Sequence, residues 1–356
     1  MITTQLIRYR LRAQHLVPPY FTKPVDVVEW MGAVQAQDYL GALWSVGQRL
    51  KKSVEADVEE AIAKKEIVRT WPMRGTLHFV APKDSRWMLQ YLTPRVFARI
   101  ASVLRKDEID EKVLAKSTKA LINALEGGNR LTRPELYGAL ERAKISTSGT
   151  RGLHIIVCVA QRGVICFGPR QDKQHTFVLL DEWLPSFPVL PREEAMAELA
   201  IRYFKSHGPA TADDFMWWAG LTKSGALESI RDAGRSLTET QVGDNTYWLA
   251  PDAKPASSAK GIRLLPTYDE YGIGYKDRST IISRTNVQKV EGGYTSAVID
   301  DGKAIGLWRR TTGKDTVKVD VAPLNKLTKD QRAGIEAEAA RYAKFTGKNV
   351  EVLKFR

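Results

Sequence analysis

The stretch Leu131-Thr132-Arg133-Pro134-Glu135-Leu136 is a strong signal for the start of a helix. A threonine side chain caps free N–H groups at a helix start, and proline is favoured just inside the first turn, where its missing N–H is not needed. The stretch from Gly208 to Phe215, GPATADDF, likewise places a threonine before an early acid. Both stretches open a helix that precedes a further helix and two short β-like runs, so they predict a repeated unit.

Working outward, the first unit covers residues 1–82. Its expected helices are residues 4–15, 24–34, 42–50 and 54–64, and its expected strands are residues 67–72 and 76–80. The strands are joined across Met73-Arg74-Gly75, where glycine suits a tight turn.

The second and third units repeat this order. The second, residues 83–190, is expected to have helices at 84–104, 114–126, 133–143 and 150–161 and strands at 164–167 and 176–180. The third, residues 191–251, is expected to have helices at 192–206, 211–219 and 223–233 and strands at 237–242 and 246–249. Helices followed by a two-stranded hairpin are the plan of the winged helix, a helix-turn-helix variant that binds DNA.

The last part, residues 261–356, is mostly β after a linker at residues 252–260. Its expected strands are residues 262–266, 294–300, 303–310, 316–321 and 348–355, with a helix at 328–345. Asp300-Asp301-Gly302 is a strong hairpin turn. The sequence therefore predicts an α+β protein, with three tandem winged-helix units followed by a small C-terminal β-barrel that the helix closes.

The charge of the chain points to a polyanionic partner. The 356 residues include 54 Lys and Arg against 41 Asp and Glu, a formal net charge of +13. Neutralising phosphates supplies most of the non-specific affinity for DNA, although a general bias towards basic residues would give the same charge.

Other classes of function lack their usual signals. We see no long apolar run and no signal peptide, so no membrane partner is expected and the expected location is cytoplasmic, associated with the nucleoid. Cys158 and Cys166 lie in apolar runs and are interpreted as core residues. The five histidines have no zinc-site spacing, so we expect neither a metal nor another cofactor.

Several blocks together resemble one family. They are MGAVQAQD, RTWPMRGTLHFV, CFGPRQDKQHTFVLLDEWLP, HGPATADDFMWWAGLT and LLPTYDEYGIGYKDRS. In this order and over nearly the whole chain, they resemble the winged helix DNA-binding domain-containing proteins that form the AlkZ-like family of alkylpurine DNA glycosylases. The resemblance implies tandem winged helices and a C-terminal β-barrel that form a C-shaped clamp around DNA. It also implies removal of alkylated purines, notably N7-alkylguanine, and in some members of interstrand crosslinks.

The resemblance places the catalytic motif at Gln35-Ala36-Gln37, which matches the Gln-Φ-Gln branch of the family rather than its Gln-Φ-Asp branch. On the residues alone, two glutamines near a helix end are usually solvated surface. A carboxamide can, however, accept a proton from water and donate to a phosphate, so Gln35 and Gln37 are expected to position a water and stabilise the transition state. They can converge if the segment is irregular, which Gly32 favours.

Three more residues are candidates for lining the active site. Asp38 either polarises the water or caps the helix that follows. By the resemblance, Arg74 contacts a phosphate and His78 lines the lesion site, whereas the alternative for His78 is a strand histidine paired with a backbone group. Asp269 and Glu270 are paired carboxylates, which the resemblance assigns to a structural corner, with catalysis as the alternative.

Basic residues elsewhere are candidate DNA contacts, and each could also be a solvated charge. Thr150 and Arg151 start an expected recognition helix, and Tyr275, Lys276 and Arg278 follow TYDEYGIG in an expected loop at the groove. The expected second wing contributes Arg170, Lys173 and His175. The neighbouring Trp217 and Trp218 are expected in the core rather than in a base-stacking platform.

The sequence thus predicts a monofunctional DNA glycosylase that hydrolyses the N-glycosidic bond of N7-alkylpurines in double-stranded DNA. The alternative is a non-catalytic winged-helix protein that binds or regulates DNA, and a metal-dependent nuclease is a distant third. A regulator need not keep the Gln35/Gln37 pair, and many regulators carry a dimerisation heptad that this chain lacks, so a monomer is expected.

Overall fold

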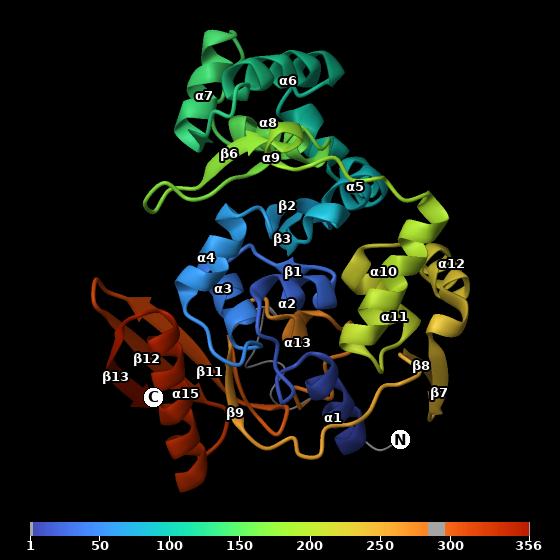
Figure 1. The fold of residues 1–356 in the computed structure, drawn as a ribbon, viewed down its shortest axis with the longest axis vertical. Coiled ribbons are helices and arrows are strands. Elements are labelled where there is room, and N and C mark those ends of the chain that lie inside the picture. Colours follow the sequence, from blue (N-terminus) through green and yellow to red (C-terminus); the bar gives the residue numbers. More distant parts are fainter. Residues whose placement is uncertain (1–2, 284–295, 356) are drawn as a thin grey trace. The chain divides into compact units, whose positions relative to one another are not determined.

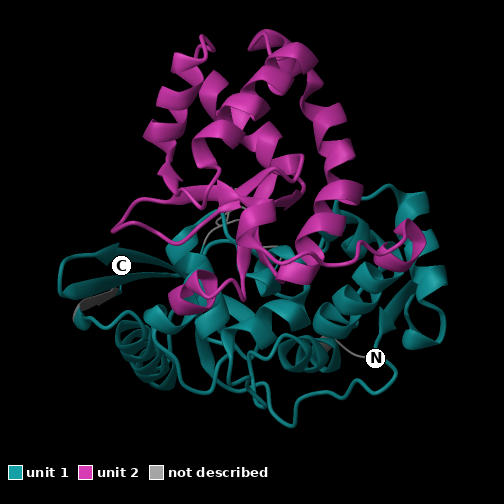
Figure 2. Ribbon diagram, turned by 45° about the horizontal axis from the view of Figure 1, so that its top comes forward, with its two compact units in different colours: residues 1–58, 196–356 teal, residues 59–195 magenta. Residues whose placement is uncertain are grey.

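The computed structural model describes residues 3–283 and 296–355, in which helices and strands are mixed (Figure 1). The α+β class is therefore confirmed. The chain divides into two compact units (Figure 2). Unit 1 consists of residues 1–58 and 196–356, and unit 2 consists of residues 59–195. Unit 2 is thus inserted in the chain of unit 1, and residues more than two hundred positions apart meet within unit 1.

The N-terminal part of unit 1 is helical. It contains α1 (Thr3–Ala13), α2 (Pro24–Met31), the short strand β1 (Val34–Gln35) and α3 (Tyr39–Gly47). The next helix, α4 (Glu55–Ala63), runs across the boundary into unit 2.

The chain returns to unit 1 through α10 (Arg192–His207). The elements that follow are α11 (Ala212–Ala219), α12 (Lys223–Ala233), the 3-10 turn η1 (Gly234–Ser236) and the hairpin of β7 (Thr238–Val242) and β8 (Asn245–Leu249). The predicted start of α11 is confirmed, because the Thr211 side chain accepts from the Asp214 N–H and the Asp214 side chain accepts from the Thr211 N–H.

The C-terminal part of unit 1 is a five-stranded sheet in the order β13-β12-β11-β10-β9. Its elements are β9 (Ile262–Leu265), the short helix α13 (Glu270–Ile273), β10 (Ala297–Asp300), β11 (Lys303–Thr312), β12 (Thr316–Pro323), α15 (Lys329–Phe345) and β13 (Asn349–Phe355). The hairpin at Asp301-Gly302 is confirmed, since both residues have positive φ between the paired Asp300 and Lys303.

The predicted closed barrel is corrected by the strand order. Among the described residues, β9 and β13 form the two edges of the sheet and are not neighbours, so the sheet is open. The pairing of β12 with β13 is parallel, because α15 carries the chain back between them. Residues 294 and 295 of one predicted strand lie outside the described residues, and β10 covers the rest of that strand from Ala297.

The packing of α15 anchors α3. Trp44 of α3 lies 5.2 Å, between ring centroids, from both Tyr342 and Phe345 of α15, and its Nε1 donates to the Leu264 carbonyl at 2.7 Å. A Cβ on Gly47 would lie 2.2 Å from the Phe345 ring, so this contact requires glycine. Aromatic pairs of this kind contribute about 0.5–1.5 kcal/mol each beyond their burial. The helix that follows the Gln35-Ala36-Gln37 segment is therefore fixed to the C-terminal sheet.

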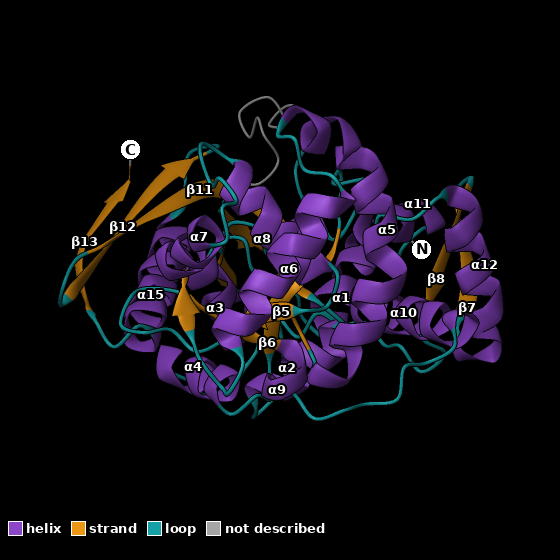
Figure 3. Ribbon diagram, turned by 90° about the horizontal axis from the view of Figure 1, so that it is seen from above, coloured by secondary structure: helices purple, strands orange, loops and turns teal. Residues whose placement is uncertain are grey.

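Unit 2 combines helices with a sheet whose strands run in the order β3-β2-β5-β6-β4. Its helices are α5 (Pro82–Lys106), α6 (Glu111–Leu125), α7 (Arg133–Arg142), α8 (Arg151–Gln161) and α9 (Leu180–Trp183). Its strands are β2 (Val68–Met73), β3 (Thr76–Val80), β4 (Leu131–Thr132), β5 (Ile165–Phe167) and β6 (Thr176–Leu179). Figure 3 views α6, α7 and α8 in front of β5 and β6. Thr132 is the N-cap residue of α7, as predicted, and both its N–H and its hydroxyl donate to Glu135 Oε2 at 2.7 Å.

The three predicted units have the expected order of helices and hairpins, but the first two do not stand as separate winged helices. In unit 2 the first hairpin, β2–β3, joins the second, β5–β6, through the pairing of Arg69 with Phe167. The two predicted wings therefore form one sheet. The predicted limits at residues 82, 190 and 251 stay predictions, and the division into two compact units falls at other positions, after residues 58 and 195.

Two further observations concern the whole described chain. Cys158 and Cys166 are buried and carry free thiols, and burial raises the pKa of Cys158 to about 11 and that of Cys166 to about 12, which confirms them as inert core residues. No helix within residues 3–283 and 296–355 is both long and apolar enough to span a bilayer.

Candidate active site

The Gln35-Ala36-Gln37 segment follows a helix that ends early. The helix predicted to reach residue 34 stops at Met31, because Gly32 adopts φ +75°, a conformation that favours glycine, and its N–H bonds to the Glu29 carbonyl. Between α2 and α3 the chain forms the short strand β1 and then a bend at residues 37–38, so the irregular segment that Gly32 was expected to allow is present only after Gln35.

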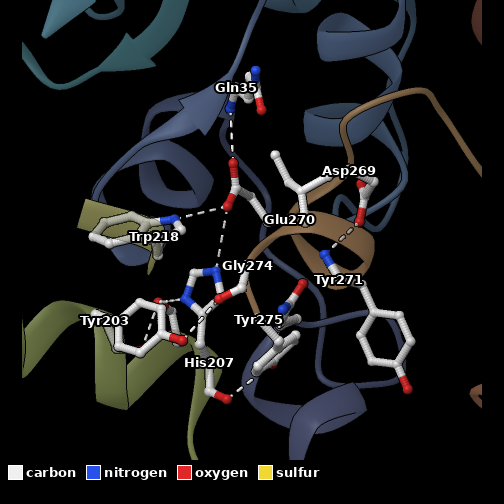
Figure 4. Close-up of polar contacts among 12 residues, drawn as sticks. Gln35, Tyr203, His207, Trp218, Asp269, Glu270, Tyr271, Gly274 and Tyr275 are labelled. Carbon is white, nitrogen blue, oxygen red and sulfur yellow. Dashed lines mark hydrogen bonds and ion pairs between the residues drawn. The ribbon is translucent and has the colours of Figure 1, made fainter. Parts of the chain in front are cut away.

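Alternate burial distinguishes the two glutamines. Gln35 is 7% exposed and Ala36 is fully buried, whereas Gln37 is exposed. The backbone N–H of Gln35 donates to Glu270 Oε1 at 2.9 Å. Figure 4 shows the Gln35 side-chain amide directed away from that carboxylate. The convergence of both amides on one water stays a prediction.

Asp38 caps the next helix, as one of its two interpretations predicted. Its Oδ1 accepts from the Gly41 N–H at 3.2 Å, and the helix starts at Tyr39, earlier than predicted. Both carboxylate oxygens also accept from Nη2 of Arg310 on β11, at 2.6 and 2.7 Å. Asp38 therefore ties the end of the glutamine segment to the C-terminal sheet.

Replacing Asp38 with alanine is expected to lower the free energy of unfolding by about 1–2 kcal/mol, because the helix loses its cap as well as the Arg310 pair. Asp38→Asn keeps an acceptor for the Gly41 N–H and should cost less. Urea unfolding of both variants measures the difference. An Asp38→Ala protein as stable as the wild type would contradict the role given to this side chain.

Glu270 of α13 is the buried acid beside Gln35 (Figure 4). It is fully buried, and its Oε2 accepts from Trp218 Nε1 at 2.9 Å. His207 Nε2 lies 3.5 Å from the same oxygen, too far for a good hydrogen bond. Burial lowers the pKa of His207, so its ring is neutral at neutral pH.

Asp269 belongs to a different network. Its carboxylate accepts from two guanidinium nitrogens of Arg49 at 2.8 and 3.0 Å, from Ser45 Oγ at 2.7 Å and from Gln48 Nε2 at 2.9 Å. Arg49 and Asp269 side chains are each 1% exposed. The carboxylate of Asp269 thus accepts hydrogen bonds from the C-terminal half of α3 and the residues just after it. Asp269 therefore belongs to a structural corner, as the resemblance implied.

The other two candidates for the active site lie in unit 2. Arg74 and Gly75 both have positive φ between the paired Met73 and Thr76, which confirms the tight turn. Arg74 Nη2 donates to His78 Nε2 at 3.1 Å, so His78 Nδ1 carries the proton that bonds to the Thr76 carbonyl at 2.9 Å. His78 is fully buried, and its bond to the Thr76 carbonyl fits the alternative interpretation of a strand histidine paired with a backbone group. A phosphate contact by Arg74 and a lesion contact by His78 stay predictions.

The residues at the start of α8 are engaged within unit 2. Thr150 is the N-cap residue of α8, and its Oγ1 donates to Asp107 Oδ2 at 3.3 Å. Arg151 donates to the carbonyls of Asp107, Ser146 and Glu108. These bonds give Arg151 a structural role in joining the end of α5 to the start of α8, and a DNA contact would have to compete with them.

The predicted second wing carries one clearly exposed cation. Lys173 is exposed, whereas Arg170 is paired with Glu59. Burial, with the nearby Arg69 and Arg170, lowers the pKa of His175 to about 4. His175 is therefore neutral at neutral pH, and any bond it makes to a phosphate would be a neutral hydrogen bond rather than an ion pair.

The stretch after TYDEYGIG is partly core. Tyr275, expected in a loop at the groove, is fully buried beneath Arg10, and its hydroxyl donates to the His207 carbonyl. Lys276 and Arg278 are the basic residues of this stretch, and Lys276 Nζ pairs with Asp213 at 2.7 Å.

The expectation for the two neighbouring tryptophans is half confirmed. Trp218 is fully buried, but Trp217 is 41% exposed.

In the part of the chain that the structure describes, no group of three His, Cys, Asp or Glu is arranged to hold a metal ion.

The comparisons with known proteins point to one family of DNA glycosylases. A family model described as DNA glycosylase AlkZ-like matches residues 28–345. The interstrand DNA cross-link repair glycosylase of Streptomyces sahachiroi is 28% identical, over 96% of this chain and 96% of that protein. The solved structure of DNA glycosylase AlkZ from the same organism has a TM-score of 0.80 at 24% identity and covers 99% of each chain.

Because the family model covers most of the sequence, the protein is a DNA glycosylase. The chain belongs to the AlkZ-like family of these enzymes.

Proposed function

We propose that this protein is a monofunctional glycosylase that hydrolyses the N-glycosidic bond of N7-alkylpurines in duplex DNA, including purines in interstrand crosslinks. The observation that carries the proposal is the Gln35-Ala36-Gln37 motif on a segment held near both ends. Glu270 accepts from the N–H of Gln35, the first residue of the motif, and Arg310 pairs with Asp38, the residue that follows the motif. The name of the Streptomyces relative, a cross-link repair glycosylase, supports the extension to crosslinks.

Two neutral amides are sufficient for this reaction, because the alkylated base is already a good leaving group. Alkylation of N7 places a positive charge on the purine, so the base leaves neutral and needs little acid catalysis. The remaining work is to aim a water at C1′ and to stabilise positive charge on the sugar. Gln35 and Gln37 would do so by accepting from the water and donating to a phosphate. Contributions of this kind come from positioning and electrostatics and need no strong general base.

The duplex would be held by basic side chains. The net charge of +13 favours a polyanion, and the exposed Lys173 together with Arg170, Lys276, Arg278 and Arg74 are the proposed phosphate contacts. Thr150, Arg151 and His175 are weaker candidates because of their bonds within unit 2 and the neutral state of His175. We propose a monomer acting on the DNA of the nucleoid.

The test is incubation of excess protein with a duplex that carries one N7-methylguanine, followed by alkali, which cleaves abasic sites. We expect cleavage at the lesion only after alkali, at a rate that EDTA does not change. Cleavage before alkali would indicate lyase or nuclease chemistry. Binding without any abasic product would favour the non-catalytic DNA-binding alternative. A crosslinked duplex run beside the mono-adduct tests the extension to crosslinks.

A further inference from the structure

A buried carboxylate that contacts the catalytic motif needs a reason, because burying a charge costs several kcal/mol unless donors surround it. Glu270 is fully buried, yet one of its oxygens accepts from a backbone N–H of the motif itself. We propose that Glu270 is a positioning residue that fixes Gln35 for base excision, an inference that rests on the proposed function.

The hydrogen bonds of Glu270 divide between its two oxygens. Oε1 accepts from the Gln35 N–H at 2.9 Å and Oε2 from Trp218 Nε1 at 2.9 Å. A group that accepts on both oxygens behaves as a carboxylate rather than as a carboxylic acid or an amide. Bonds from N–H groups to an ionised acceptor are about twice as strong as neutral ones, so Gln35 is held firmly.

The surroundings of Glu270 are rigid. Tyr203 of α10 stacks on His207, with ring centroids 4.7 Å apart and an angle of 14° between the planes. The Tyr203 hydroxyl donates to the Gly274 carbonyl at 2.8 Å, just after α13. Ser206 Oγ lies 2.8 Å from His207 Nδ1. The Tyr203–Gly274 bond ties the end of α13 to α10, and the other two contacts hold the His207 ring beside Glu270 (Figure 4).

The two acids at the start of α13 have different tasks. Asp269 holds α3 through Arg49 and Ser45. Glu270 instead reaches the motif, and it does so through the backbone while the amide of Gln35 points the other way (Figure 4). Glu270 is thus placed to set the position of Gln35 rather than to act on the substrate. An error of about 1 Å in such a position can cost about a hundredfold in rate.

The test is a double-mutant cycle of Glu270→Gln and Gln35→Ala, measured as single-turnover excision from a duplex with one N7-methylguanine, together with duplex Kd. Glutamine at position 270 has one acceptor oxygen where the carboxylate has two, so one of the two donors loses its partner. We expect Glu270→Gln to slow excision about tenfold to a hundredfold without changing Kd. In the Gln35→Ala background it should have no further effect, because both changes act through Gln35.

Two more variants keep the test sharp. Trp218→Phe removes the donor to Oε2 together with part of a buried ring, and it should slow excision in the same direction, so it serves if Glu270→Gln does not fold. Tyr271→Phe removes a buried hydroxyl that donates to the Gly302 carbonyl at 3.0 Å and not to Glu270, and it should leave the excision rate unchanged.

The outcomes separate this inference from the proposed function. A slow Gln35→Ala protein with a wild-type rate for Glu270→Gln and Trp218→Phe overturns the role of Glu270 alone, as does a Glu270→Gln effect that adds in full to that of Gln35→Ala. A wild-type rate for Gln35→Ala overturns the proposed role of Gln35 and this inference with it.

Discussion

Replacing Gln37 with alanine is expected to slow excision of N7-methylguanine by about 10²- to 10³-fold, the usual cost of removing one donor that stabilises a transition state. Gln37 is exposed and follows the buried Ala36, so its removal opens no cavity in the core. The expected change is therefore in the rate of the chemical step, with duplex Kd and unfolding free energy unchanged. Single-turnover kinetics with excess protein measure it.

A matched variant sharpens this prediction. The family resemblance includes a branch with Gln-Φ-Asp, so Gln37→Asp should retain much more activity than Gln37→Ala, because a carboxylate also accepts a proton from water. Equal activity of Gln37→Ala and the wild type would remove Gln37 from the mechanism.

The largest effect on stability is expected for Asp269→Ala. This change leaves Arg49, whose side chain is 1% exposed, without its carboxylate partner. Removing one partner of a buried pair costs about 3–5 kcal/mol, because the other charge stays buried and uncompensated. Urea unfolding, in which the midpoint falls with stability, measures the loss.

The control is Asp213→Ala, which breaks the solvent-exposed pair with Lys276 and should cost about 0–1 kcal/mol. An Asp269→Ala protein within about 1 kcal/mol of the wild type would contradict the structural role of this corner.

Local signals in the sequence were enough to predict most elements. The ends of α12 and β3 agree with the prediction residue for residue, because a threonine cap and a glycine turn mark them. The end of α2 was missed by a few residues, since Gly32 stops the helix before the apolar pattern does. The short α13 has no periodicity of its own, and the Asp269 cap that starts it was not recognised.

The long-range arrangement could not be predicted from such signals. The single pairing of Arg69 with Phe167 turns two expected wings into one sheet, and nothing in either hairpin sequence specifies the other as its partner. The open edge of the C-terminal sheet is a similar case, because the strands of an open sheet and of a small closed barrel have similar sequences.

The candidate site shows the same limit. The motif could be read from Gln35-Ala36-Gln37 and its family resemblance, and the cap from Asp38 alone. The residues that hold the motif are 235 positions away at Glu270 and 272 positions away at Arg310. Because such contacts depend on the whole of unit 1, the acidic pair at 269–270 could be assigned to a structural corner by the resemblance, but the separate partners of Asp269 and Glu270 could not be predicted.

The most direct test of the central claim is the release of free base. Wild-type protein and the double variant Gln35→Ala/Gln37→Ala are each bound to a duplex with one N7-methylguanine, and the free base and the remaining strand are quantified by mass spectrometry. The account predicts that the wild type releases one 7-methylguanine for each intact abasic strand, while the double variant binds equally well and releases base no faster than DNA alone. Base release by the double variant at the wild-type rate, or none by the bound wild type, would contradict it.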